Sequence, residues 1–349
     1  MSGDTRLESL HHWLKDSLGI PFRQLQPASA DASFRRYFRM WDAAGNTKVV
    51  MDAPPEKEDL AAYLRVSALL EQCGVHVPHV HAHDEALGFA LLEDLGGTHM
   101  LTALAEGADA DSLYGEALDE LARLQLAGDA ASRQLPPYDR ATLLREMQLL
   151  PDWYCLRHLG FAPDAAQRNT LEQCFDWLAT EALAQPQVFV HRDYHSRNLM
   201  VMPQRSPGVI DFQDALRGPV GYDLASILKD CYVDWPRVRV VQWVEQFRQQ
   251  LLASGAAGAA LAGESLPQFL RWFDLIGLQR HIKVLGIFAR LFWRDGKSGY
   301  LADLPRTLQY VRDTAALYPE LAAFSALVEQ HLAPGLGAAN ERALAAARA

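Results

Sequence analysis

The feature that most constrains the fold of this chain is the stretch from Val188 to Asp211, which reads VFVHRDYHSRNLMVMPQRSPGVID. Three polar residues, Asp193, Asn198 and Asp211, stand in it at wide intervals. Apolar runs flank these polar positions, and short apolar runs of this kind are typical of buried strands. We therefore expect a set of short strands that presents a polar loop.

The order of the polar residues indicates a chemistry. H-R-D-x-x-x-x-N followed by D-F is a phosphoryl-transfer pattern, in which one Asp accepts the proton of the attacking hydroxyl. An Asn and a second Asp then hold Mg²⁺ against the phosphates of ATP. A metal cluster of His191, Asp193 and His195 is the alternative interpretation, but no further Cys or His at ligand spacing supports a zinc site.

Composition limits the remaining possibilities. The 349 residues allow one large domain or two, and a hydrophobic content of 49% allows a substantial core. The net charge of -10 argues against nonspecific binding to nucleic acid or to a membrane surface. The four cysteines form no CxxC pair and predict free thiols in a reducing cytoplasm. We expect a cytoplasmic protein, because the N-terminus lacks a signal-peptide apolar region and no apolar segment is long enough for a bilayer.

The first part of the chain predicts a small sheet with helices. Apolar residues at helical spacing predict a helix over 7–18. A strand over 33–41, a turn over 43–47 that contains Gly45 and a return strand over 48–51 are expected to follow. The small residues of 28–33 lie where a phosphate-binding loop is needed, with Ser29, Ala32 and Ser33 as candidates for contact with the nucleotide. An ordinary hairpin turn is an equally good interpretation of this segment.

A helix is predicted over 57–72, and a strand over 88–92. Four histidines, His76, His79, His81 and His83, alternate between them. A metal site is one interpretation, but a strand with one solvated face is favoured because no Cys or carboxylate cluster accompanies them. The segment 93–97 ends in two glycines and is expected to link two lobes, 1–97 and 98–349.

The second lobe is predicted to be mainly helical. Gly221 opens one of its helices, with Asp223 as a plausible cap. The segment 254–263 is either a loose helix or a loop. The other helices are expected over 112–127, 140–158, 167–184, 238–252 and 266–293.

Taken together, HRDYHSRN, DFQD and GYDLA resemble the aminoglycoside phosphotransferase and choline kinase superfamily. The resemblance implies an α+β, bilobal, protein-kinase-like fold with ATP bound between a sheet-containing lobe and a larger helical lobe. More narrowly, DASFRRYFR, VVMDAPPEKED and GLQRHIKVLGIFARL resemble bacterial cell-wall-sugar kinases. That similarity implies phosphorylation of the anomeric hydroxyl of N-acetylmuramate and N-acetylglucosamine in peptidoglycan recycling.

The resemblance also implies roles for individual residues. Asp193 is expected to be the catalytic base, and Asn198 and Asp211 the Mg²⁺ ligands. His195 is expected either near the transferred phosphate or as a loop histidine bonded to backbone. His191 is expected to support the loop. The adenine edge is expected against the linker backbone, at Glu93, Asp94 and Leu95, and bracing of the catalytic loop is expected from Asp214 and Asp223.

One departure from the pattern concerns the phosphates of ATP. Kinases usually carry a Lys on the return strand, paired with a helix Glu. Here Lys48 begins that strand and Met51 occupies its interior, while Glu58 and Glu71 stand at the two ends of the helix. The pair is therefore unassigned, and Lys48, Arg35, Arg36 or the loop amides remain candidates for phosphate binding.

Two alternatives to a sugar kinase remain. The chain can be another small-molecule kinase, acting on an aminoglycoside, choline or another amino alcohol, or a non-catalytic nucleotide-binding protein. A protein kinase is disfavoured because D-F-Q-D replaces D-F-G and no A-P-E follows. Candidates for sugar contact, each more often found in core packing or on a solvated face, are Trp153, Tyr154, Trp235, Arg280 and Lys283. The sequence does not indicate the oligomeric state.

Overall fold

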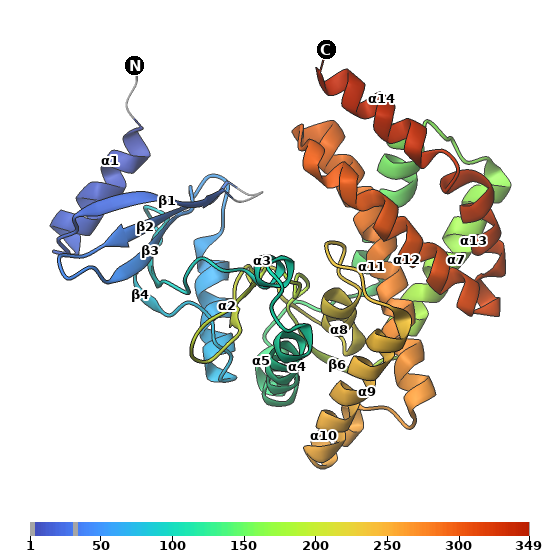
Figure 1. Ribbon diagram of the computed structural model, residues 1–349, viewed down its shortest axis with the longest axis horizontal. Coiled ribbons are helices and arrows are strands. Elements are labelled where there is room, and N and C mark those ends of the chain that lie inside the picture. The colour runs from blue at the N-terminus through green and yellow to red at the C-terminus, as the bar shows by residue number, and fades with distance from the viewer. Residues whose placement is uncertain (1–3, 31–33, 349) are drawn as a thin grey trace.

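Five antiparallel strands form the sheet of the smaller lobe, in the order β1-β2-β3-β5-β4. The computed structural model describes residues 4–30 and 34–348, and its two lobes lie side by side along the long axis (Figure 1). The strands are β1 (Gln24–Ala30), β2 (Arg36–Trp41), β3 (Thr47–Asp52), β4 (Val80–Asp84) and β5 (Phe89–Glu93). β1 was missed by the sequence prediction, which treated 28–33 as a loop. The strand predicted over 33–41 begins at Arg36.

Alternation along the strands sends apolar side chains to both faces of the sheet, as a period of two requires. Val50 of β3 faces the cluster built on the N-terminal helix α1 (Thr5–His12), which includes Leu10 and the following π-helical turn Trp13–Ser17. Met51, the next residue of β3, faces the opposite cluster, which contains α2 (Leu60–Gln72). The sheet is therefore covered by a helix on each face.

The helix α2 starts later than its apolar spacing alone predicts. The side chain of Asp59 accepts a hydrogen bond of 2.9 Å from the backbone N–H of Ala62 and so caps the first turn. Residues 57 and 58 therefore precede the helix, which leaves the side chain of Glu58 at its entrance.

The histidine-rich segment follows the predicted strand only in part. His79, His81 and His83 are exposed beside or on β4, which confirms a solvated face for these three. His76 is 8% exposed, so the prediction is wrong for this residue. Its ring Nδ1 lies 2.8 Å from the carbonyl oxygen of Arg205. Residues 4–30 and 34–348 contain no group of three or more His, Cys, Asp or Glu arranged to hold a metal ion.

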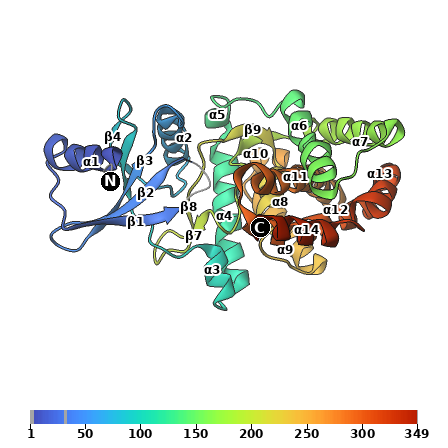
Figure 2. The ribbon, with the colours of Figure 1, turned by 90° about the horizontal axis from the view of Figure 1, so that it is seen from above.

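The larger lobe is helical and is organised around α11 (Leu266–Asp295), a 30-residue helix with buried residues on all sides. Gly286 of this helix meets the backbone of Leu149, where an added Cβ would lie 2.4 Å from its carbonyl carbon. Figures 1 and 2 both place α4 (Ala110–Ala127) between the N-terminal sheet and α11. The other helices are α3 (Met100–Ala105), α5 (Asp129–Ser132), α6 (Arg140–Met147), α7 (Ala165–Leu183), α8 (Gly221–Leu228), α9 (Arg237–Ala253), α10 (Ala256–Leu261), α12 (Leu304–Leu317), α13 (Ala322–Leu327) and α14 (Leu336–Arg348).

Short turns complete the helical lobe. The segment Leu150–Leu159 continues α6 as a π-helical stretch, so the single helix predicted over 140–158 is two pieces. Further single turns lie at Ser298–Asp303, Pro319–Leu321 and Val328–Leu332. The segment predicted as loose helix or loop over 254–263 contains α10.

Two small antiparallel ribbons cross the helical lobe at its border with the sheet. β6 (Gln187–Val190) pairs with β9 (Leu216–Pro219), and β7 (Leu199–Met200) pairs with β8 (Gly208–Val209). These are the short strands expected around the polar motif. The loops that join them carry the candidate catalytic residues.

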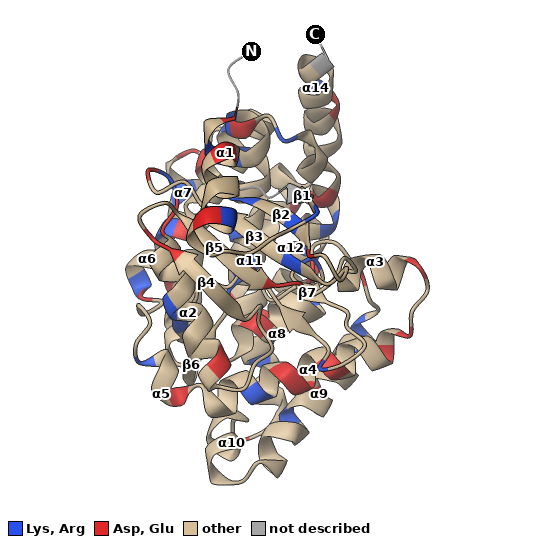
Figure 3. Cartoon of the chain, turned by 90° about the vertical axis from the view of Figure 1, so that its left-hand side faces the viewer, with Lys and Arg blue, Asp and Glu red and all other residues tan. Residues whose placement is uncertain are grey.

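The distribution of charged residues and the state of the cysteines can be compared with the expectations from composition. Basic and acidic residues are interspersed on the face shown in Figure 3. The four cysteines are buried free thiols. Among the residues that the structure describes, no helix has the length and apolar character needed to cross a membrane.

Candidate active site

The β7–β8 ribbon brings two polar residues together that are distant in sequence. Its register pairs Leu199 with Val209, so Asn198 and Asp211 lie near each other at the same end. The Asn198 side-chain amide donates to the backbone oxygen of Asp193 at 3.0 Å and to Asp211 Oδ2 at 3.3 Å. The sequence motif thus corresponds to one compact group.

Two of these loop positions have unusual backbone conformations. Arg192 has a φ of 80° and Asp211 a φ of 64°, in the left-handed region that non-glycine residues rarely adopt. Such strain persists only where surrounding contacts hold it, and it is frequent at functional sites.

The buried carboxylate of Asp223 fixes the backbone of the catalytic loop. Asp223, in the first turn of α8, accepts hydrogen bonds from the backbone N–H of His191 at 2.6 Å and of Arg192 at 2.9 Å. The prediction that Asp223 caps its own helix is wrong, because its carboxylate faces the loop instead. Burial, reinforced by the charge of Asp193, raises the pKa of Asp223 to about 7 although the two N–H donors oppose this. Asp214, the other predicted brace, is exposed.

His191 supports the loop as a neutral imidazole. Its Nδ1 accepts from the backbone N–H of Asp193 at 3.2 Å, and its Nε2 lies 3.0 Å from the carbonyl oxygen of Ile210. These partners require the proton on Nε2. Burial lowers the pKa of His191 to about 4, so the ring stays neutral at physiological pH.

Buried cations surround the candidate base. Burial alone would raise the pKa of Asp193, but the nearby charges of Lys283, Arg280 and Arg192 outweigh it and lower this pKa. Asp193 is therefore an ionised carboxylate at neutral pH.

The cations have their own counter-charge. Glu146 of α6 pairs with Arg192 and lies 3.2 Å from Lys283 Nζ, and it also accepts from the hydroxyl of Tyr138. Burial acts to raise the pKa of Glu146, but Lys283 and Arg192 lower it overall. A buried charge is costly unless it is paired, so these charges must stay together. Because they come from α6, α11 and the catalytic loop, the network links these three segments.

The candidate metal ligands have the chemistry that Mg²⁺ prefers, a carboxylate and an amide oxygen. The Asp211 carboxylate already attracts a cation, because Arg35 Nη2 lies 3.0 Å from its Oδ1. Gln213 Nε2 also donates to Oδ1, at 3.1 Å. Asn198 and Asp211 thus fit a divalent cation that would neutralise the phosphate charge of a bound nucleotide.

A cleft of about 590 Å³ lies above these residues, between the two lobes. Its lining includes Asn198, Asp211 and His195, together with Arg197, which precedes Asn198. Apolar side chains and the linker provide a surface suited to a flat base, namely Val49, Leu92, Met200, Ile210 and the segment 93–97.

The linker is held by an ion pair with the sheet. Arg39 of β2 donates to Asp94 at 2.6 and 2.9 Å and to the Gly96 carbonyl oxygen at 2.7 Å. Burial would raise the pKa of Asp94, but Arg39 lowers it overall. The Asp94 side chain is therefore engaged with β2 of the sheet.

The structure places only some of the other residues that were predicted to contact the nucleotide. Ser29 lies in β1, and Ala32 and Ser33 lie outside the described residues. His195 lines the cleft, and burial lowers its pKa. Within 4–30 and 34–348, the buried Nδ1 of His195 has no hydrogen-bond partner, so the ring is not the backbone-bonded loop histidine considered above.

The predicted sugar contacts lie elsewhere. Tyr154 is fully buried and its hydroxyl bonds to the Leu332 carbonyl oxygen, so that prediction is wrong. Trp153 packs against the core, and the Trp235 indole donates to the Tyr114 hydroxyl at 2.8 Å. Arg280 is 4% exposed and contributes charge beneath Asp193.

Sequence reasoning missed the aromatic residues that the larger lobe contributes to the cleft, Tyr232 and Tyr300. The guanidinium carbon of Arg197 lies 3.6 Å from the centre of the Tyr232 ring, and the His195 ring meets Tyr232 edge-on. The backbone N–H of Tyr232 donates to Asp230, which also binds the backbone N–H of Ser196 at 3.0 Å. The tyrosine position is therefore fixed relative to the catalytic loop, although no local sequence signal marks it.

Comparison with known proteins agrees with this geometry. The chain is 45% identical to the N-acetylmuramate/N-acetylglucosamine kinase of Pseudomonas aeruginosa, over 94% of this chain and 97% of that protein. Solved structures with a similar fold include the ADP-bound aminoglycoside phosphotransferase APH(2'')-Ib, with a TM-score of 0.56 and 15% identity over 89% of this chain and 99% of that one. The choline kinase LicA of Streptococcus pneumoniae has a TM-score of 0.58 and 13% identity over 89% and 99% of the two chains.

The fold comparison confirms the expected bilobal α+β kinase-like architecture. The model of the phosphotransferase enzyme family matches residues 24–273, which include β1 to β9 and the whole catalytic loop. This chain belongs to the phosphotransferase enzyme family.

Proposed function

We propose that this protein is an ATP- and Mg²⁺-dependent sugar kinase that phosphorylates the anomeric hydroxyl of N-acetylmuramate, N-acetylglucosamine or both. The product is the sugar 1-phosphate, and the setting is peptidoglycan recycling in the cytoplasm. The observation that carries the proposal is the convergence of three residues: Asn198 and Asp211, which line the cleft, and Asp193, whose backbone oxygen accepts from the Asn198 amide. The identity to a named amino-sugar kinase supports the choice of acceptor.

Each residue of the group has a task in this reaction. Asp193 accepts the proton of the attacking hydroxyl, and its lowered pKa keeps it ionised for that role. Asn198 and Asp211 hold Mg²⁺, which neutralises the charge on the phosphates. The linker backbone at Glu93, Asp94 and Leu95 binds the adenine edge. We infer that residues 1–97 form the nucleotide lobe and 98–349 the catalytic and acceptor lobe.

The acceptor side of the cleft is the wall formed by Arg197, Tyr232 and Tyr300. Aromatic rings stack well on the apolar faces of sugars, and Tyr232 lies next to His195, two positions after the base. The Arg197 guanidinium stacks on Tyr232 and keeps its edges available for a carboxylate. N-Acetylmuramate carries such a carboxylate on its lactyl ether, whereas N-acetylglucosamine does not.

The anomeric position suits this base. An anomeric hydroxyl is more acidic than the other hydroxyls of a sugar, so a carboxylate with a low pKa can accept its proton as the phosphoryl group transfers.

The direct test is ADP release from ATP with a panel of acceptors. N-Acetylmuramate and N-acetylglucosamine should support turnover, and omission of Mg²⁺ should abolish it. If only choline or an aminoglycoside supports turnover, the acceptor is that compound and not an amino sugar. Absence of turnover with every acceptor, with ATP still bound, would favour a non-catalytic nucleotide-binding protein.

A further inference from the structure

The nucleotide lobe lacks the lysine that phosphoryl-transfer enzymes of this architecture place on the return strand. The interior position of β3 is Met51, which is fully buried and packs toward α2. Lys48 pairs with Met40 and with Glu93, at the linker end of β3. The opposite end of the strand, at Asp52, is four positions and about 13 Å away. A nucleotide whose base meets the linker would therefore need another cation for its phosphates.

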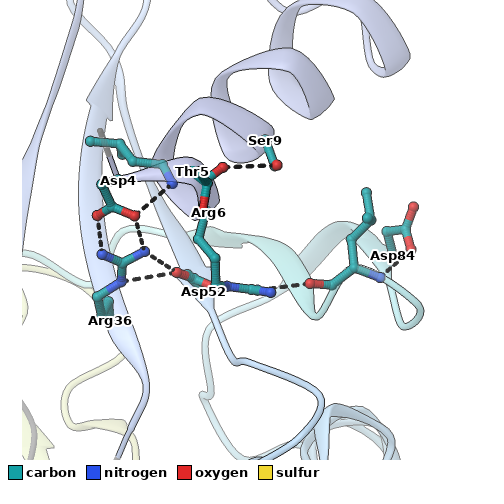
Figure 4. Close-up of polar contacts among 9 residues, drawn as sticks. Asp4, Thr5, Arg6, Ser9, Arg36, Asp52 and Asp84 are labelled. Carbon is teal, nitrogen blue, oxygen red and sulfur yellow. Dashed lines mark hydrogen bonds and ion pairs between the residues drawn. The ribbon is translucent and has the colours of Figure 1, made fainter. Parts of the chain in front are cut away.

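Most cations of this sheet are already engaged in the structure. Asp52, fully buried, accepts from both Arg6 and Arg36, and Arg36 also reaches Asp4 (Figure 4). This cluster fastens α1 to the sheet, on the side away from α2. Arg39 is held by Asp94 at the linker.

Arg35 differs from these residues in its position. It is 8% exposed, and its Nη2 lies 3.0 Å from Oδ1 of Asp211, so it bridges from the N-terminal lobe to a candidate metal ligand. Its Nε lies 3.7 Å from Oε2 of Glu58. The other oxygen of Glu58 accepts from the backbone N–H of Phe34 at 2.9 Å, so Glu58 fixes both the backbone beside Arg35 and its side chain.

We propose that Arg35, positioned by Glu58, is the cation that binds the β- and γ-phosphates of the nucleotide, in place of the strand lysine. The proposal rests on the proposed function, because it concerns the nucleotide of that reaction. Arg35 and Glu58 form the same kind of pair as the usual strand Lys and helix Glu, a cation held by a carboxylate. Here the carboxylate stands at the start of α2, and the cation is the residue that precedes β2. A guanidinium offers a planar pair of N–H donors that matches two phosphate oxygens.

The contact with Asp211 fits this role. Arg35 and Mg²⁺ would together neutralise the charge of the same phosphates. The phosphates must approach Asp211, and Arg35 lies beside this residue. The ion pair of 3.0 Å between Arg35 Nη2 and Asp211 Oδ1 places this guanidinium directly beside the candidate metal ligand.

Equilibrium binding tests the proposal without requiring catalysis. Isothermal titration calorimetry of Arg35→Ala with adenosine, AMP, ADP and ATP, each with and without Mg²⁺, resolves the contribution of each phosphate. We expect the affinity for ADP and ATP to fall by about 10- to 100-fold, the size of a lost charge-assisted contact, while adenosine and AMP stay within about twofold. Glu58→Gln should weaken ATP binding by a smaller factor, because Arg35 keeps its charge but loses its positioning partner.

Two further variants make the result decisive. Arg65→Ala removes an exposed arginine of α2 and should bind all four ligands as the wild type does. Arg35→Lys keeps the charge and should recover part of the ATP affinity, which also covers the case in which the alanine variant fails to fold.

The proposal is overturned if folded Arg35→Ala and Arg35→Lys both bind ATP like the wild type, or if adenosine is weakened as much as ATP. Failure of the proposed function is distinguishable. If the wild type binds ATP but phosphorylates no sugar, the acceptor assignment fails and the loss of ATP affinity in Arg35→Ala still supports the role of Arg35.

Discussion

The carboxylate of Asp223 accepts a hydrogen bond of 2.6 Å from the backbone N–H of His191, although the two residues are 32 positions apart. With the second bond from Arg192, this contact fixes the backbone just before Asp193. A helix of the larger lobe therefore sets the position of the candidate base without any contact with substrate.

Asp223→Asn should damage catalysis and stability together. An amide can accept only one of the two N–H groups at a time with its single oxygen, and its NH2 opposes the other donor. We expect a loss of about 1–3 kcal/mol in the free energy of unfolding and a fall in kcat of about 10- to 100-fold from displacement of the base. Urea unfolding and steady-state kinetics check both. Asp214→Asn, an exposed neighbour, is the control, and equal effects in the two variants would remove Asp223 from this role.

Asp193→Asn keeps the size of the side chain and removes its basicity. We expect kcat to fall by on the order of 10²- to 10⁴-fold with little change in the KM for ATP, because the carboxylate acts on the acceptor hydroxyl and not on nucleotide binding. Steady-state kinetics at saturating sugar measure this. Near-normal turnover would show that another group accepts the proton.

His191 should make stability depend on pH. Its pKa is lowered by burial from 6.5 to about 4 in the folded protein, so the folded state favours the neutral ring. The corresponding stability is fully present above pH 6.5 and is lost as the pH falls toward 4, an effect of about 3 kcal/mol. The raised pKa of Asp223 acts in the opposite sense over part of this range, so the wild type must be compared with His191→Gln.

The measurement is the free energy of unfolding of both proteins from pH 4 to 7. The advantage of the wild type should shrink as the pH falls. A difference between the two proteins that stays constant over this range would contradict a buried neutral His191.

Arg197 should discriminate between the two candidate sugars. If it pairs with the lactyl carboxylate, Arg197→Gln lowers kcat/KM for N-acetylmuramate by about 10- to 100-fold and leaves N-acetylglucosamine within about twofold. The ratio of the two values is the informative quantity, because a general disturbance of the loop lowers both. An equal loss for both sugars would place Arg197 in loop structure instead.

Local patterns in the sequence were sufficient for the core of the site. Asn198 and Asp211 flank the single hairpin β7–β8, and Asp193 stands only five positions before Asn198, so the sequence alone indicated that the three residues meet. The short apolar runs of β3 and β5 similarly indicated strands, and both faces of the sheet are indeed apolar.

Local sequence patterns could not predict contacts between residues that are far apart in the chain. Arg35 meets Asp211 across 176 positions, and Tyr232 and Tyr300 join the cleft from segments without a distinctive local pattern. Tyr154 was misjudged because an aromatic side chain looks the same in sequence whether it faces a ligand or the core. β1 was missed because its residues, QLQPASA, are mostly small or polar and pair only at the edge of the sheet.

The central claim is phosphoryl transfer to the anomeric oxygen of an amino sugar, and ³¹P NMR of the product tests it most directly. Wild-type protein with ATP, Mg²⁺ and N-acetylglucosamine or N-acetylmuramate should give a sugar 1-phosphate that mild acid hydrolyses. The methyl glycoside, in which the anomeric oxygen is blocked, should give no phosphorylated product while ATP still binds. A 6-phosphate, or phosphorylation of the methyl glycoside as fast as the free sugar, would contradict the account.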